Sequence, residues 1–131
     1  MSTAELLICT TCRASGTARD AAPDGQRLFD AVLALGLPAG LHLRGIACLS
    51  ACSRSCSAAL QAPGKFTYVF GDLPADAASA EQLLLVAAQH LRLDDGQLPW
   101  SDRPERLRRG VVARLVPALN FTSTHADAEL C

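Results

Sequence analysis

Apolar and polar positions in the first half of the chain follow two different periods. Residues 4–9 form a short apolar run and are a predicted strand. In residues 41–48, leucine and alanine alternate with His42, Arg44 and Ile46, which predicts a second strand with one face partly exposed to solvent. Between them, residues 26–35 place apolar side chains at helical spacing, with Asp24 as the expected N-cap. The pattern predicts a strand–helix–strand unit, in which the two strands run parallel.

The pattern then predicts a hairpin. Residues 57–61 and 66–70 have the composition of strands, and a Pro-Gly pair lies in the connection at residues 62–65. Proline followed by glycine suits the two central positions of a type II turn. We therefore expect these two strands to be antiparallel neighbours.

Helical spacing returns in the last third of the chain. Residues 79–93 form an amphipathic pattern, and Ser79 and Gln82 are placed as a capping box. A shorter helix is expected over residues 102–109, with Pro104 at its first position. Both helices follow the hairpin, so the predicted element order is strand, helix, strand, strand, strand, helix, with a short helical addition.

The end of the chain is less regular. Residues 111–119 are apolar and could dock along the sheet or a helix, and Trp100 is expected to anchor the returning chain by packing. Residues 120–131 lack apolar periodicity and are predicted to form a flexible tail. The expected architecture is one α/β domain over residues 1–119, with a mixed four-stranded sheet and helices packed on it.

Composition describes an ordinary soluble domain. A chain of 131 residues that is 50% hydrophobic can bury a core without disulfides or a structural metal. A net charge of −1 and a pI near 6.3 give no general attraction to nucleic acid. Neither a basic, apolar leader nor a membrane-length apolar segment is present, so we expect a cytoplasmic protein with reduced thiols and no membrane association.

Five of the six cysteines gather in two short segments. Cys9 and Cys12 follow the first predicted strand, and Cys48, Cys52 and Cys56 follow the second at four-residue spacing. Because parallel strands end at the same edge of a sheet, the topology should bring the two segments together. Thiolates hold iron-sulfur clusters and zinc, and a Cys-x2-Cys pair near such a unit also occurs in dithiol oxidoreductases. These three uses stay open.

Other residues near the cysteines carry weaker signals. Cys56 shares a strand face with Ala58 and Leu60, so it is either a buried core thiol or a further metal ligand. Dithiol chemistry is the least favoured use, because about ten residues separate Cys12 from the helix whose N-terminus would lower a thiol pKa. The histidines lie outside both cysteine segments, and His90 is the one that most merits inspection. The three are His42, His90 and His125.

These motifs carry a resemblance. Across residues 8–13, 48–56 and 99–104, the chain resembles a bacterial family of unknown function described as predicted metal-binding proteins. The second cysteine segment of this chain is also similar to that of thioredoxin-like [2Fe-2S] ferredoxins and of the related small subunit of NADH dehydrogenases. The resemblance implies a thioredoxin-like fold, an electron-transfer or redox accessory role without catalysis, and a link to cobalamin or metal metabolism. It also implies a [2Fe-2S] cluster held by Cys9, Cys12, Cys48 and Cys52.

The chain departs from the ferredoxin pattern in two places. Only two residues separate the first cysteine pair, where the ferredoxins have a longer interval, and Cys56 stands where the relatives usually have proline. The main rival is a metal-binding or metal-delivery protein that holds zinc or another soft ion by the same thiolates, and a thioredoxin-like dithiol oxidoreductase is third. Arg13 and Arg54 lie beside the cysteines and would offset the negative charge of a cluster.

A run of arginines follows the tryptophan. Such a run is either a solvated face or a docking patch for an acidic redox partner, since complementary charge steers association. The lack of interleaved aromatic residues argues against binding of single-stranded nucleic acid. We name four residues as candidates for docking an unidentified redox protein: Arg103, Arg106, Arg108 and Arg109. The sequence leaves a homodimer open.

Overall fold

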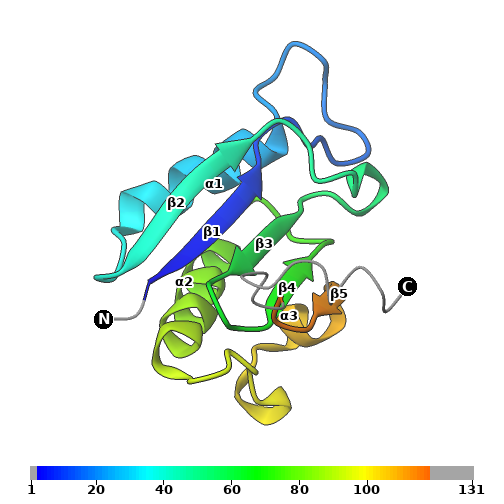
Figure 1. The fold of residues 1–131 in the computed structure, drawn as a ribbon. Coiled ribbons are helices and arrows are strands. Elements are labelled where there is room, and N and C mark those ends of the chain that lie inside the picture. Colours follow the sequence, from blue (N-terminus) through cyan, green and yellow to red (C-terminus); the bar gives the residue numbers. More distant parts are fainter. Residues whose placement is uncertain (1–2, 119–131) are drawn as a thin grey trace, which may run out of the picture.

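The structure, a computed structural model, describes residues 3–118 apart from the side chain of Cys52 and shows a five-stranded mixed sheet (Figure 1). The strand order is β2-β1-β3-β4-β5. β1 (Ala4–Cys9) pairs in parallel with β2 (Leu41–Ile46) and antiparallel with β3 (Ala58–Gln61). β4 (Thr67–Phe70) and β5 (Val111–Leu115) extend the sheet as antiparallel strands.

The predicted parallel unit and hairpin are both confirmed. α1 (Asp24–Leu35) connects β1 to β2, and α2 (Ala77–Arg92) follows β4. The hairpin between β3 and β4 closes as expected, because the N–H of Lys65 donates to the carbonyl of Ala62 at 3.2 Å and Gly64 has a φ of 71°. That positive φ is what a type II turn requires at its second central position.

The core lies between the sheet and the two long helices. Alternate residues of the strands point toward the helices, and each helix packs one apolar face against the sheet. Residues of both helices and of four strands form one buried cluster, whose fully buried members include Leu6, Ile8, Leu28, Val32, Leu60, Tyr68, Phe70, Leu83 and Val86. The opposite side of the strands carries polar residues such as Glu5 and Gln61.

The sheet has one strand more than predicted. Residues 111–115 pair with the outer edge of β4 as β5, with a register irregularity at Val69 and Phe70. An edge strand satisfies backbone groups of its neighbour and needs no buried side chains, and only Val111 of β5 is partly buried. The apolar run therefore shows no alternating pattern that would distinguish a strand from a docked coil. For this reason the prediction of four strands is wrong.

Both long helices begin with caps other than those predicted. Pro23 takes the N-cap position of α1, while Asp24 is the first helical residue and accepts a hydrogen bond from the hydroxyl of Thr17 at 2.7 Å. In α2 the N-cap is Asp76, whose carboxylate accepts from the N–H of Ser79 at 2.8 Å. Because Asp76 and Ser79, three residues apart, are both residue types that cap helices, the sequence placed the start of α2 two residues late.

The predicted helix over residues 102–109 is divided. A single 3-10 turn, η2 (Trp100–Asp102), precedes the short helix α3 (Glu105–Arg109). Pro104 stands at the N-cap position of α3 rather than at its first helical position. The proline accordingly marks the boundary between the two elements.

The tryptophan is not the anchor that the sequence led us to expect. Trp100 is 61% exposed, and Leu98 and Leu107 are the residues of this segment that enter the core. Size and hydrophobicity favour burial of an indole, but here the two leucines fill the space beside the sheet. The prediction that Trp100 anchors the returning chain by packing is therefore wrong.

The predicted flexible tail at residues 120–131 lies outside the described residues, so the domain limits stay a prediction. Between residues 3 and 118 no helix is both long and apolar enough to cross a membrane.

Candidate metal centre

The two cysteine segments meet at the carboxyl ends of the parallel strands. Both the N–H and the hydroxyl of Thr10 donate to the carbonyl of Ile46, at 2.9 and 3.1 Å. The thiol of Cys9 lies 3.7 Å from the carbonyl oxygen of Ala47, the residue before Cys48. The predicted juxtaposition is thus present, and hydrogen bonds fix the first segment to the start of the second.

Cys9 and Cys12 are both buried, at 1% and 3% exposure. They share a partner that the sequence analysis missed, Ser57, which is itself fully buried. Its hydroxyl lies 3.5 Å from the sulfur of Cys12, and its carbonyl accepts from the N–H of Cys9 at 3.1 Å. Strand alternation places Ser57 on the face opposite Cys56, and that signal could have identified it.

The two thiols differ in acidity. Burial opposes ionisation of Cys9, but hydrogen bonds from Cys12, from Thr11 and from the backbone of Leu49 together lower its pKa. Burial, followed by the interaction with Cys9, raises the pKa of Cys12, and the hydrogen bonds of Ser57 only partly oppose this rise. The pair is therefore arranged so that the first thiolate forms at Cys9, where an electrophilic metal can bind it.

Cys48 lies in the neighbouring loop and is exposed. Its sulfur accepts a hydrogen bond from the N–H of Ser50 at 3.1 Å, and Ser50 adopts a positive φ of 58°. Cys52 begins the short turn η1 (Cys52–Arg54), and its side chain lies outside the described part of the structure. Among the side chains that are described, no three of His, Cys, Asp and Glu are close enough together to hold a metal ion.

Cys56 has the environment of a core thiol. Its side chain is buried in the same apolar cluster as Ala58 and Leu60, and its backbone exchanges two hydrogen bonds with Leu73, at 3.0 and 3.2 Å. Burial, with a smaller contribution from the negative charge of Asp24, raises the pKa of Cys56 to about 12. The place of this side chain in the apolar core favours a packing role over a ligand role.

The two arginines beside the cysteines have partners elsewhere. Arg13 donates to the carbonyls of Ala18 and Ala21, at 2.8 and 2.7 Å, and so holds its own loop together. Arg54 forms an ion pair with Asp72, with an Nε to carboxylate distance of 2.9 Å. The ion pair balances the charge of Arg54, whereas hydrogen bonds to neutral carbonyls leave the charge of Arg13 in place. For Arg13 the expectation that it offsets the charge of a cluster stays a prediction.

The start of α1 lies against the first cysteine segment. The N–H of Gly25 donates to the carbonyl of Cys12 at 3.0 Å, and a β-carbon on Gly25 would lie 1.8 Å from the carbonyl oxygen of Cys9. From the length of the loop between Cys12 and the helix, the sequence alone disfavours dithiol chemistry. The fold brings these parts together, so that argument is wrong, although the acidic Asp24 at the helix start opposes any gain in thiol acidity.

Neither of the two histidines within residues 3–118 takes part in this site. His90 is fully buried on α2, and its Nε2 lies 2.8 Å from the carbonyl oxygen of Phe66. His42 is exposed on β2, and His125 lies outside the described residues.

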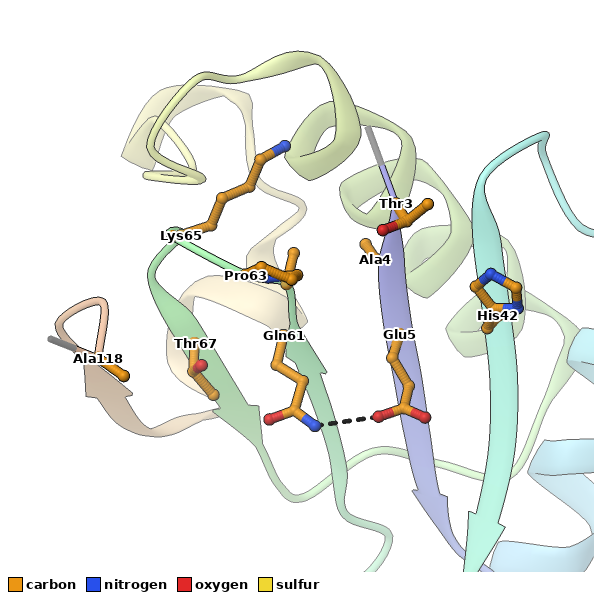
Figure 2. A pocket seen from close by; sticks show the side chains of 11 residues that line it. Thr3, Ala4, Glu5, His42, Gln61, Pro63, Lys65, Thr67 and Ala118 are labelled. Atoms are coloured by element: carbon orange, nitrogen blue, oxygen red, sulfur yellow. Dashed lines mark hydrogen bonds between the residues drawn. The ribbon is translucent and has the colours of Figure 1, made fainter. Parts of the chain in front are cut away.

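A separate pocket of about 460 Å³ opens at the other end of the sheet (Figure 2). The carboxylate of Glu5 accepts from the amide of Gln61 at 3.0 Å and pairs with Arg44 at 2.9 Å. Figure 2 shows Lys65 extending away from these groups, and its Nζ donates to the carbonyl of His90 at 2.7 Å. None of the predicted site residues lines this pocket.

The structure pairs two of the predicted docking arginines with carboxylates: Arg106 with Asp76 at 3.0 Å and Arg109 with Glu105 at 3.3 Å. The other two, Arg103 and Arg108, lie over the ring of Trp100. The four residues are therefore not equivalent.

Two solved structures place the chain in the class of thioredoxin-like folds. Both are of a thioredoxin-like [2Fe-2S] ferredoxin from Aquifex aeolicus. The first has a TM-score of 0.53 at 14% identity and covers 92% of this chain and 100% of the other. The second, of the wild-type protein, has a TM-score of 0.52 at 13% identity and covers 86% and 99%. The predicted fold class is confirmed.

The family is identified by the sequence itself. Residues 6–118 match the family described as protein of unknown function, DUF1636, and the chain belongs to it. No curated protein matches the sequence. The resemblance recognised from the cysteine motifs is confirmed at the level of this family and of the ferredoxin fold.

Proposed function

We propose that this protein is a small electron carrier that binds a [2Fe-2S] cluster and has no catalytic activity of its own. The proposed ligands are Cys9, Cys12, Cys48 and Cys52. The observation that carries the proposal is the hydrogen-bonded contact between the two cysteine segments, at the strand ends of a fold shared with [2Fe-2S] ferredoxins.

The donor set fits the chemistry of such a cluster. Thiolates are the usual ligands of its irons, and hydrogen bonds to sulfur stabilise the thiolates and raise the reduction potential. Here the backbone of Leu49 supports the thiolate of Cys9, the N–H of Ser50 supports Cys48, and the hydroxyl of Ser57 supports Cys12. When bound, the cluster would supply one-electron redox chemistry.

The unequal exposure of the two segments suits electron transfer. Cys9 and Cys12 are buried and their positions are fixed by the sheet, whereas Cys48 lies on an exposed loop. A group held between them would be anchored on its inner side and close to the surface on its outer side. Electrons could then pass to a partner without a large conformational change.

A zinc-binding or metal-delivery protein is the second candidate. The observation that favours it is the two-residue spacing between Cys9 and Cys12, which is typical of structural zinc sites. The same four cysteines would serve, because zinc also prefers four soft ligands in a closed site.

Serine substitution of one cysteine at a time tests the ligand assignment, with iron, sulfide and zinc measured after anaerobic reconstitution. We expect Cys9→Ser, Cys12→Ser, Cys48→Ser and Cys52→Ser to lose most of the bound metal. Cys56→Ser is the matched control and should retain it, because its thiol belongs to the core. Full metal content in both Cys48→Ser and Cys52→Ser would refute the role of the second segment.

A further inference from the structure

The exposed side chain of Trp100 is held in place by contacts with its neighbours. The guanidinium carbon of Arg103 lies 5.3 Å from the centroid of the Trp100 ring and 5.5 Å from that of Tyr68, so it contacts a surface ring and a core ring. Tyr68 is buried, and its hydroxyl accepts from the N–H of Leu98 at 2.9 Å. The indole is thus supported from the core, and a partner that binds it would restrict little further motion.

Positive charge surrounds the same ring. Arg108 lies 5.8 Å above the Trp100 ring, and residues 100–114 contain five arginines against two carboxylates. Neither Arg103 nor Arg108 has a carboxylate within ion-pair distance among residues 3–118. An acidic protein can complement such a surface, in which an apolar ring is flanked by unpaired cations. Tryptophan and arginine are also among the residues most enriched at binding hot spots.

This surface is linked by the backbone to the second cysteine segment. The N–H of Gly71 donates to the carbonyl of Gly110, at the end of α3, at 2.7 Å. On its other side, a β-carbon on Gly71 would lie 3.0 Å from the carbonyl oxygen of Arg54, which lies two residues beyond Cys52. The basic helix and the cysteine loop are therefore separated by a single residue, and α3 lies beside β4 and β5 (Figure 1).

We propose that Trp100, Arg103 and Arg108, here called the Trp100 patch, form the docking surface for an acidic redox protein that exchanges electrons with this one. That the partner is a redox protein rests on the proposed function, in which this protein carries electrons. Arg106 and Arg109 are paired with carboxylates of the domain, which balance their charges, so they are not part of the patch.

Single-stranded nucleic acid is the other ligand that combines stacking with positive charge. Proteins that bind it offer several aromatic rings to successive bases along a basic groove. The Trp100 patch has one exposed ring, and two guanidiniums already lie over it. The geometry therefore favours a protein surface with a carboxylate cluster around an apolar recess.

Trp100 is the only tryptophan of the chain, so its fluorescence reports on the patch directly. The probes are two haem proteins of opposite charge, acidic cytochrome b5 and basic cytochrome c, because haem quenches a nearby indole. We expect saturable quenching of Trp100 by the acidic protein at low ionic strength, weakened by added salt. Arg108→Glu should weaken this binding roughly tenfold or more, since it replaces attraction with repulsion.

Arg19→Glu is the matched control, because it makes the same change in net charge at an exposed loop position. It should bind like the wild type. Equal quenching by both haem proteins, equal effects of the two charge reversals, or tighter binding of a short single-stranded oligonucleotide would each overturn the proposal. Binding is measured without the cluster, so a protein that docks but carries no iron would refute only the proposed function.

Discussion

A side chain on Gly25 would begin 1.8 Å from the carbonyl oxygen of Cys9, so only glycine allows α1 to start against the first cysteine segment. Inside a helix, alanine is ordinarily favoured over glycine by about 1 kcal/mol. In Gly25→Ala the clash with the carbonyl of Cys9 should outweigh this preference for alanine. The free energy of unfolding should then fall by about 1–3 kcal/mol, or by more if the backbone cannot shift. It should also reduce metal binding, because the carbonyl of Cys9 must move.

Urea unfolding measures this effect. Gly16→Ala is the control, since open space surrounds that residue and only its positive φ opposes a side chain. It should cost about 1–2 kcal/mol and leave metal binding unchanged. A Gly25→Ala protein as stable as the wild type would contradict the packing described for α1.

Ser57 should tune the site through its hydroxyl. Ser57→Ala removes the hydrogen bond to the sulfur of Cys12 and leaves that thiolate less stabilised. The pKa of Cys12, already raised by burial, should rise further, and a bound cluster should have a lower reduction potential. A redox titration of the reconstituted variant beside Ser53→Ala, an exposed control, checks this, and identical potentials would show that the hydroxyl has no electrostatic role.

His90 predicts how stability responds to acid. Burial, with help from the positive charge of Lys65, lowers the pKa of His90 below its ordinary value, against the hydrogen bond to the carbonyl of Phe66. In the unfolded chain the imidazole binds a proton near pH 6.5. The unfolded state therefore binds more protons below that pH, and stability should be fully present above it and fall as the pH drops toward the lowered native pKa.

Unfolding free energies measured between about pH 8 and pH 5 test this prediction. His90→Gln should lower stability at neutral pH but flatten the loss between pH 7 and pH 5, because glutamine does not titrate. A wild-type profile with no decline in this window would mean that the native state accepts the proton on His90.

Periodicity was sufficient to predict the parts of the fold that bury one face. Residues 4–9 and 26–35 show their periods because one side of each segment enters the core, and the parallel pairing then follows from handedness. The same logic predicts that Cys9 and Cys48 lie at the same edge of the sheet.

The features that the sequence did not reveal depend on contacts between distant residues. β5 pairs through its backbone at an exposed edge, so its side chains carry no signal. Ser57 becomes part of the site only because β3 runs antiparallel beside β1, and Trp100 stays outside because Leu98 and Leu107 fill the core. The pairing of β5 and the exposure of Trp100 leave no local pattern in composition or spacing, whereas strand alternation indicates the face on which Ser57 lies but not its neighbours.

The most direct test of the central claim is the metal content of the wild-type protein purified without oxygen. The account predicts a coloured protein with iron and acid-labile sulfide in equal amounts, and with little zinc. A colourless protein with one zinc per chain would contradict the ferredoxin assignment and support the second candidate.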